Sequence, residues 1–127
     1  MRKVNQNDLP EERRLSPKGI YEVYRKHLSL AIGGKKDIGV WGGGHPFDIE
    51  LARIPPGKIN YPLHAHAAQY EHYIILSGRG AVRDDSSRKI EIKPGDHFMV
   101  SPGEAHQVIN TGNEDLVYYV VSDHPPT

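Results

Sequence analysis

Short runs in which hydrophobic and polar residues alternate make up most of the chain from residue 45 onward. The run FDIELARI at 47–54 shows this pattern and stops at a Pro-Pro-Gly turn, and similar runs follow at close spacing. A period of two is typical of strands, and closely spaced turns are typical of a barrel or sandwich. We therefore predict an all-β fold of about eight strands, at 47–54, 58–66, 70–76, 97–100, 105–110 and 116–122, with a hairpin over 81–92.

The residues before this region have a less regular pattern. Residues 1–15 are polar and charged and predict an arm with at most a turn or two of helix, and 20–32 predicts a strand followed by an irregular stretch. Three consecutive glycines at 42–44 disfavour a regular element, because ordering glycine costs backbone entropy. We expect residues 1–44 to pack on the barrel or on a dimer partner, and residues 45–127 to form one barrel domain.

Composition narrows the classes of partner and chemistry. Sixteen basic and sixteen acidic residues cancel, so the chain lacks the positive field that nucleic acid or an anionic membrane surface requires. The first residues lack the apolar segment of a signal peptide, which favours a cytoplasmic protein. The chain has no cysteine, so a metal would need nitrogen and oxygen ligands.

Eight histidines in 127 residues are the one anomaly of the composition. His64 and His66 are two positions apart, so on a strand their side chains share a face about 7 Å apart along the backbone. Glu71 follows after a short corner, and His106 begins a later strand, where barrel closure can bring it to the same interior point. A lone histidine is more often a packed or solvated group, but the four residues together predict a metal site.

The sequence around these positions resembles the two motifs of the cupin superfamily. Residues 57–78, GKINYPLHAHAAQYEHYIILSG, are similar to the first motif, in which a glycine precedes His-x-His, a glutamate and a second glycine. Residues 95–110, GDHFMVSPGEAHQVIN, are similar to the second motif, with its glycine, turn, histidine and asparagine. The departures lie in turns: six residues instead of five separate Gly57 from His64, and Ser101 stands where the family usually has proline.

This resemblance implies a double-stranded β-helix, also called a jelly-roll barrel, and a homodimer. It also implies one divalent transition metal, with Fe, Mn, Ni, Zn, Co and Cu all open, held by His64, His66, Glu71 and His106. Gln69 remains an alternative to Glu71 as the oxygen ligand, because the sequence does not fix the geometry of the corner between His66 and Glu71. The other histidines are expected elsewhere: His72 on the opposite face, His97 unassigned, and His27, His45 and His124 at the surface.

A site of three histidines and one carboxylate leaves positions on an octahedral ion for water, dioxygen or a bidentate ligand. We therefore expect a metal-dependent enzyme of the oxygenase, isomerase or decarboxylase type that acts on a sugar derivative or organic acid, with Glu71 as the candidate catalytic base. The alternative is a non-catalytic module that binds or senses a small ligand. The fold does not choose between them, because one fold hosts many functions.

Overall fold

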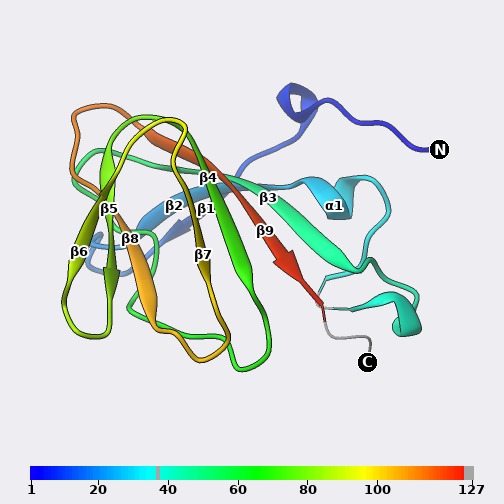
Figure 1. The fold of residues 1–127 in the computed structure, drawn as a ribbon. Helices are drawn as coiled ribbons and strands as arrows, with labels where there is room; N and C mark the ends of the chain where they lie inside the picture. Colours follow the sequence, from blue (N-terminus) through cyan, green and yellow to red (C-terminus); the bar gives the residue numbers. More distant parts are fainter. Residues whose placement is uncertain (37, 125–127) are drawn as a thin grey trace.

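The computed structural model describes residues 1–36 and 38–124 as two antiparallel sheets with a few short helical segments (Figure 1). The strands are β1 (Glu12–Leu15), β2 (Glu22–His27), β3 (Phe47–Ile54), β4 (Glu71–Ser77), β5 (Gly80–Asp84), β6 (Lys89–Ile92), β7 (His97–Val100), β8 (His106–Asn110) and β9 (Leu116–Asp123). The helical segments are η1 (Gln6–Asp8), α1 (Leu28–Ala31) and η2 (Val40–Gly42). None of these described helices has the length and apolar character to cross a membrane.

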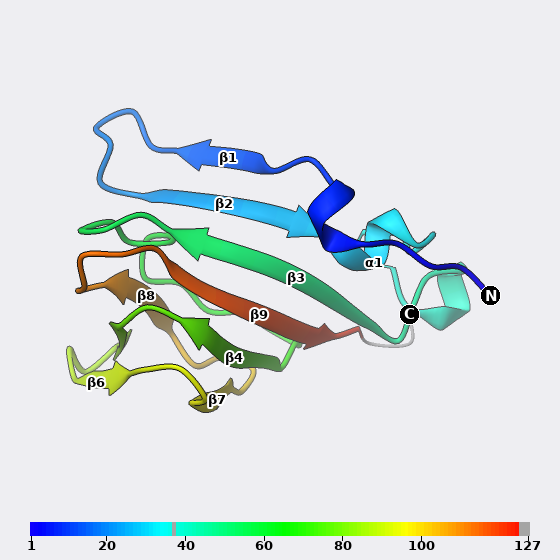
Figure 2. The same ribbon diagram turned by 90° about the horizontal axis from the view of Figure 1, so that it is seen from above.

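The larger sheet has the strand order β1-β2-β3-β9-β4-β7, which Figure 2 shows from above, and the smaller sheet has the order β6-β5-β8. The last strand, β9, lies between β3 and β4 and pairs with β3 along its whole length, from Phe47 opposite Asp123 to Ile54 opposite Leu116. Strands that are distant in the sequence therefore lie side by side in the centre of the sheet, as an antiparallel jelly roll requires.

The hydrophobic core lies between the two sheets. Its fully buried members come from both, and include Ile54 and Leu116 of the larger sheet and Val108 of the smaller one, each with no exposed surface. Alternation places these residues on the inner faces, while neighbours such as Arg53 point outward. Burying one such aliphatic side chain stabilises the fold by about 1.5–3 kcal/mol.

Most of the strands predicted from alternation are confirmed, including the hairpin of β5 and β6. The strand predicted over 58–66 is wrong: this segment is a coil that pairs only through isolated bridges at Ile59 and His64. Pro62 lies in the middle of the segment and has no N–H to donate to a ladder. The coil nevertheless follows the edge of β8, since Ile59 bridges to Ile109 and His64 to His106.

The N-terminal segment contributes strands to the larger sheet. β2 pairs with β3, and β1, which the sequence pattern did not predict, pairs with β2. The predicted strand in 20–32 is confirmed by β2, and the stretch after it contains the single turn α1. The glycine cluster coincides with the end of η2, where Gly43 has a φ of +82°, a conformation that glycine adopts at little cost.

Candidate metal centre

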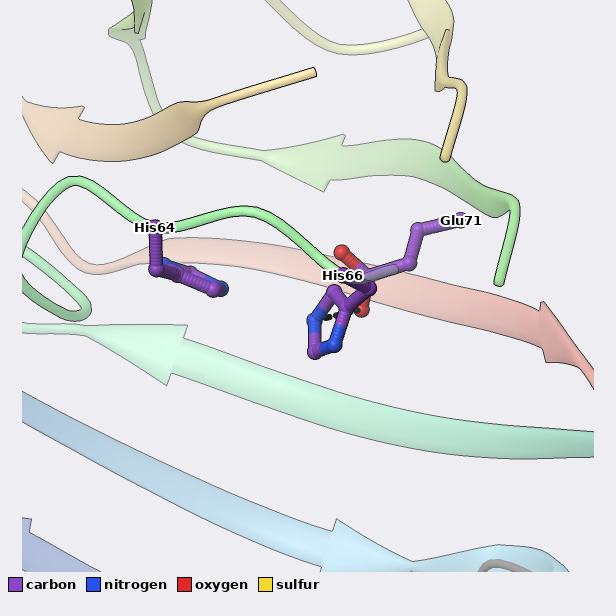
Figure 3. Close-up of side chains that lie close together, drawn as sticks. All are labelled: His64, His66 and Glu71. Carbon is purple, nitrogen blue, oxygen red and sulfur yellow. Dashed lines mark ion pairs between the residues drawn. The ribbon is translucent and has the colours of Figure 1, made fainter. Parts of the chain in front are cut away.

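Three side chains form a cluster that fits a metal ion. One ligand atom from each of His64, His66 and Glu71 lies within 4.8 Å of the others. Figure 3 shows the two histidines on the coil before β4 and Glu71 at the start of β4, with the His66 ring beside the Glu71 carboxylate. All three line a cavity of about 470 Å³. Nitrogen and carboxylate ligands in this number suit a divalent transition metal.

The coil that carries the two histidines is held against the smaller sheet by backbone hydrogen bonds. The N–H of His64 donates to the carbonyl of His106 at 3.2 Å, and the N–H of His106 donates back at 2.8 Å. The N–H of Gly103 donates to the carbonyl of His66 at 2.7 Å. The turn before β8 therefore fixes His66, and β8 itself fixes His64, although neither histidine lies in a regular strand.

Backbone carbonyls also orient two of the imidazole rings. Nδ1 of His64 lies 2.9 Å from the carbonyl oxygen of Pro62, and Nδ1 of His106 lies 3.2 Å from that of Glu104. A carbonyl oxygen only accepts, so Nδ1 is the donor in both pairs. This leaves Nε2 of each neutral ring without a proton and able to bind a metal, an arrangement that is common for metal-ligating histidines.

His106, the fourth predicted ligand, lies behind Glu71, outside the group of three and not among the residues that line the cavity. Its side chain is 2% exposed, and its Nε2 atom lies 2.9 Å from Oε1 of Glu71 and 3.1 Å from the hydroxyl of Tyr73. When Nδ1 of His106 carries the proton of a neutral ring, Nε2 and Oε1 are two acceptors at contact distance, and a cation or a second proton has to lie between them. Two ligand atoms at about 2.1 Å from one ion and at right angles to each other are about 3 Å apart, so the spacing fits a shared metal.

The electrostatics of the cluster favour deprotonated ligands. Burial lowers the pKa of His64 below its usual value, so its imidazole is neutral at pH 7. Burial acts to raise the pKa of Glu71, but when a second proton lies between Oε1 and Nε2 of His106, that hydrogen bond and the positive charge beside the carboxylate outweigh burial and hold this pKa below its usual range. A neutral imidazole and an ionised carboxylate are the forms that bind metal.

Gln69 lines the same cavity, but its side chain is directed to another partner. Its amide Nε2 lies 3.2 Å from Nδ1 of His124, and the other nitrogen of His124 lies 2.6 Å from the Asp48 carboxylate. The carboxylate of Glu71, in contrast, contacts both His66 and His106. These contacts favour Glu71 as the oxygen ligand.

The remaining histidines differ in part from the prediction. His124 was expected at the surface, but this is wrong: its side chain is 2% exposed, because the ion pair with Asp48 holds it against β3. His27 lines the cavity instead of facing solvent alone, and His45 is partly buried. His72 and His97 contact each other at 2.9 Å in an exposed pair, away from the cluster.

Sequence reasoning missed several polar groups of the cavity wall, among them Arg25, Glu50 and Tyr61. They lie outside the His-rich motifs, on β2, on β3 and in the coil. For Glu50 and Arg25, the positions in their strands indicate that the side chains face the interior. Glu50 is two positions before the buried Ala52 on the same face of β3, and Arg25 is the register partner of Ala52.

Comparison with known proteins agrees with the fold. The Cupin domain family model matches residues 50–122, which is more than half of the chain. Among curated proteins, an oxalate-binding protein of Thermotoga maritima is 41% identical over 69 residues, covering 54% of this chain and 55% of that protein. Auxin-binding protein T85 of Nicotiana tabacum is 30% identical over 113 residues, covering 79% of this chain and 54% of that protein. The matches thus span little more than half the length of these curated relatives.

Solved structures share the architecture over nearly the whole chain. A crystal structure of a predicted oxalate decarboxylase from Thermotoga maritima has a TM-score of 0.75 at 26% identity and covers 98% of this chain and 100% of that one. A sugar phosphate isomerase from Silicibacter pomeroyi has a TM-score of 0.76 at 21% identity and covers 98% of this chain and 77% of that one. At the latter identity, the likeness shows the fold alone.

Proposed function

The chain belongs to the Cupin domain family, and from that premise we propose that it is a metal-dependent protein that acts on a small, oxygen-rich molecule such as an organic acid or a sugar derivative. The observation that carries the proposal is the cluster of His64, His66 and Glu71 on the wall of a cavity. A cavity of about 470 Å³ is in the range that takes small-molecule ligands.

We propose that His64, His66, Glu71 and His106 hold one divalent transition metal. His106 is included because its Nε2 atom lies 2.9 Å from a Glu71 oxygen and is otherwise engaged only by Tyr73 among the described residues. When bound, such a metal supplies a Lewis acid with positions open to oxygen ligands. The chain's own part is to orient the imidazoles through Pro62 and Glu104 and to exclude bulk water from the inner end of the site.

The first ligand to test is a small dicarboxylate. The support is the 41% identity to a protein named for oxalate binding, together with the structural likeness to a predicted oxalate decarboxylase. Two vicinal oxygens of such an anion are suited to bidentate binding at open metal positions.

We favour an enzyme over a non-catalytic binding module because the cavity holds carboxyl groups besides the metal cluster, such as Glu50 and Asp48. Glu71 was the predicted catalytic base. Its contacts with two histidines favour a primary role as a ligand, so proton transfer by Glu71 requires its carboxylate to leave the ion during turnover. A binding or sensory module is the second candidate, and it predicts ligand affinity without turnover.

The test measures metal content and ligand binding together. Protein purified without chelators is analysed for transition metals beside His64→Ala, His106→Ala and the control His97→Ala, whose imidazole lies in the exposed pair with His72. We expect close to one equivalent of metal in wild type and in the control, and loss of metal in the two site variants with retention of the fold. Wild type that stays metal-free after reconstitution with each candidate ion would overturn the proposal. Metal-loaded protein is then incubated with oxalate and with longer hydroxy acids: turnover of any of them supports an enzyme, and binding without turnover of any of them supports the module.

A further inference from the structure

A second carboxylate faces the cavity that contains the metal cluster. Glu50 lies in the middle of β3, where its register partners are His27 on β2 and Val120 on β9, and all three line the cavity. Its side chain is 25% exposed. Glu50 is not one of the three residues of the metal cluster, so it is available for a ligand.

The carboxylate of Glu50 has unused capacity to accept hydrogen bonds. The nearest basic groups are Nδ1 of His27 at 3.7 Å and a terminal nitrogen of Arg25 at 3.9 Å, and both distances are too long for a hydrogen bond. The stronger contacts of these two side chains go to Glu12, at 2.7 Å from Arg25 and 3.3 Å from His27. Arg25 therefore supplies positive charge near Glu50, and neither Arg25 nor His27 gives it a hydrogen bond.

The same wall also contains donors without acceptors. Nε of Arg25 and the hydroxyl of Tyr61 are buried and have no hydrogen-bond partner among the residues that the structure describes. The guanidinium carbon of Arg25 lies 5.8 Å from the centre of the Tyr61 ring, so the two donors belong to one region. Tyr61 in turn packs edge-on against His64, with ring centres 5.7 Å apart, which connects this region to the metal cluster.

Resting on the proposed function, we propose that Glu50 binds a hydroxyl group of the ligand, and that the ligand is a hydroxy acid or sugar acid longer than oxalate. A hydroxyl group donates to a carboxylate and accepts from nearby N–H and O–H donors, so it matches a wall with both kinds of group. A carboxylate only accepts, so it gains no hydrogen bond from an ionised Glu50 and is repelled by it; burial raises the pKa of Glu50, and the charge of Arg25 opposes that rise. Oxalate is also much smaller than the ligands that a cavity of about 470 Å³ accommodates.

The test uses manganese-loaded protein and three probes measured by calorimetry. D-gluconate and 2-hydroxyhexanoate carry the same carboxylate and adjacent hydroxyl for the metal, but only gluconate has further hydroxyls. Oxalate reports on the metal alone. We expect wild type to bind gluconate about tenfold more tightly than 2-hydroxyhexanoate, which is the effect of one hydrogen bond to a charged group.

Glu50→Gln should remove most of this preference. The same variant should bind oxalate as tightly as wild type or more tightly, because a negative charge near the anion is lost. The matched control Glu91→Gln changes an exposed carboxylate on the other sheet and should leave all three affinities within twofold. Opposite responses of gluconate and oxalate cannot arise from a general loss of structure.

Three results would overturn the inference. The first is that wild type does not prefer gluconate over 2-hydroxyhexanoate, a result that the wild-type protein alone can give. The second is a Glu50→Gln variant that keeps the preference, and the third is one that weakens gluconate and oxalate equally. In each of these cases the metal content and the oxalate binding of wild type stay normal, so the proposed function stands. Loss of the metal from wild type, in contrast, overturns the proposed function and the inference with it.

Discussion

His106 and Glu71 meet at 2.9 Å although they come from different sheets, His106 from β8 and Glu71 from β4. The two atoms in contact, Nε2 of a neutral His106 ring and Oε1 of Glu71, are both acceptors. They lie at the inner end of the candidate metal centre. Tyr73 adds its hydroxyl to the same two side chains, at 3.2 Å from Glu71 and 3.1 Å from His106. The metal proposal therefore depends on packing between the sheets as well as on the His-x-His motif.

Glu71→Gln should lower metal affinity by at least about tenfold, which is the lower end of the effect of changing groups around a metal site. The amide keeps the size of the side chain but loses the charge. Gln69→Leu is the matched comparison, because Gln69 lies in the same cavity and contacts His124 instead of the cluster. Competition with a fluorescent chelator measures both affinities. A larger loss in Gln69→Leu than in Glu71→Gln would mean that Gln69 is the oxygen ligand.

Asn110→Ala should destabilise the protein by about 2–4 kcal/mol. Asn110 is 1% exposed, and its amide donates to the carbonyls of Ile54 and Glu114, each at 2.7 Å. The variant leaves both carbonyls, of which that of Ile54 is buried, without this partner. Asn113→Ala, at an exposed position in the same turn, should change the free energy of unfolding by less than about 0.5 kcal/mol. Urea denaturation measures the two variants, and equal effects would contradict the role given to Asn110.

Gly78→Ala and Gly95→Ala should differ in their cost although both glycines have left-handed backbones, with φ values of +85° and +90°. The conformation itself costs an alanine about 1–2 kcal/mol. A methyl group at Gly78 would also clash with the carbonyl of Asp115 and lie 2.8 Å from Cα of Leu116, whereas at Gly95 it would meet no atom within 4 Å. We expect Gly78→Ala to cost about 1–3 kcal/mol more. Thermal unfolding that ranks the two variants the other way would contradict this.

The metal-free protein should lose stability as the pH falls below about 4.5. The hydrogen bond to Arg25 lowers the pKa of Glu12 from 4.5 to about 2. Between these values the unfolded chain takes up a proton that the folded chain does not, so stability present above pH 4.5 is lost on acidification. Denaturant titrations across this range measure the slope. In Glu12→Gln the slope should be smaller, and a variant with the wild-type slope would show that Glu12 makes no contribution.

We expect the protein to be a homodimer in solution, with twice the chain mass of 14.2 kDa. The outward surface of the larger sheet includes exposed apolar side chains, among them Leu76 and Met99, at 41% and 58% exposure. Covering such side chains favours association. Light scattering after size-exclusion chromatography gives the mass, and a monomer at all concentrations would contradict the expectation.

The sequence by itself determined the class of fold and the residues of the cluster. Alternation with a period of two requires a buried and an exposed face, and this was enough to find β3, β4 and the hairpin of β5 and β6. The spacing of His64, His66 and Glu71 was enough to group them, because a short corner limits how far Glu71 can move from the histidines. Alternation and spacing are local properties of the sequence, so they can be identified without knowledge of the tertiary contacts.

The tertiary structure decided which contacts position the residues of the cluster and which other side chains line the same cavity. His64 and His66 converge from a coil, since Pro62 interrupts the predicted strand and hydrogen bonds from His106 and Gly103 fix the backbone instead. His124 is buried by its pairing with Asp48, which lies 76 positions away. Glu50 and Arg25 face the cavity only because β2 joins the sheet beside β3. Such contacts depend on the long-range pairing of strands. The local pattern of hydrophobic and polar residues does not specify which strands become neighbours.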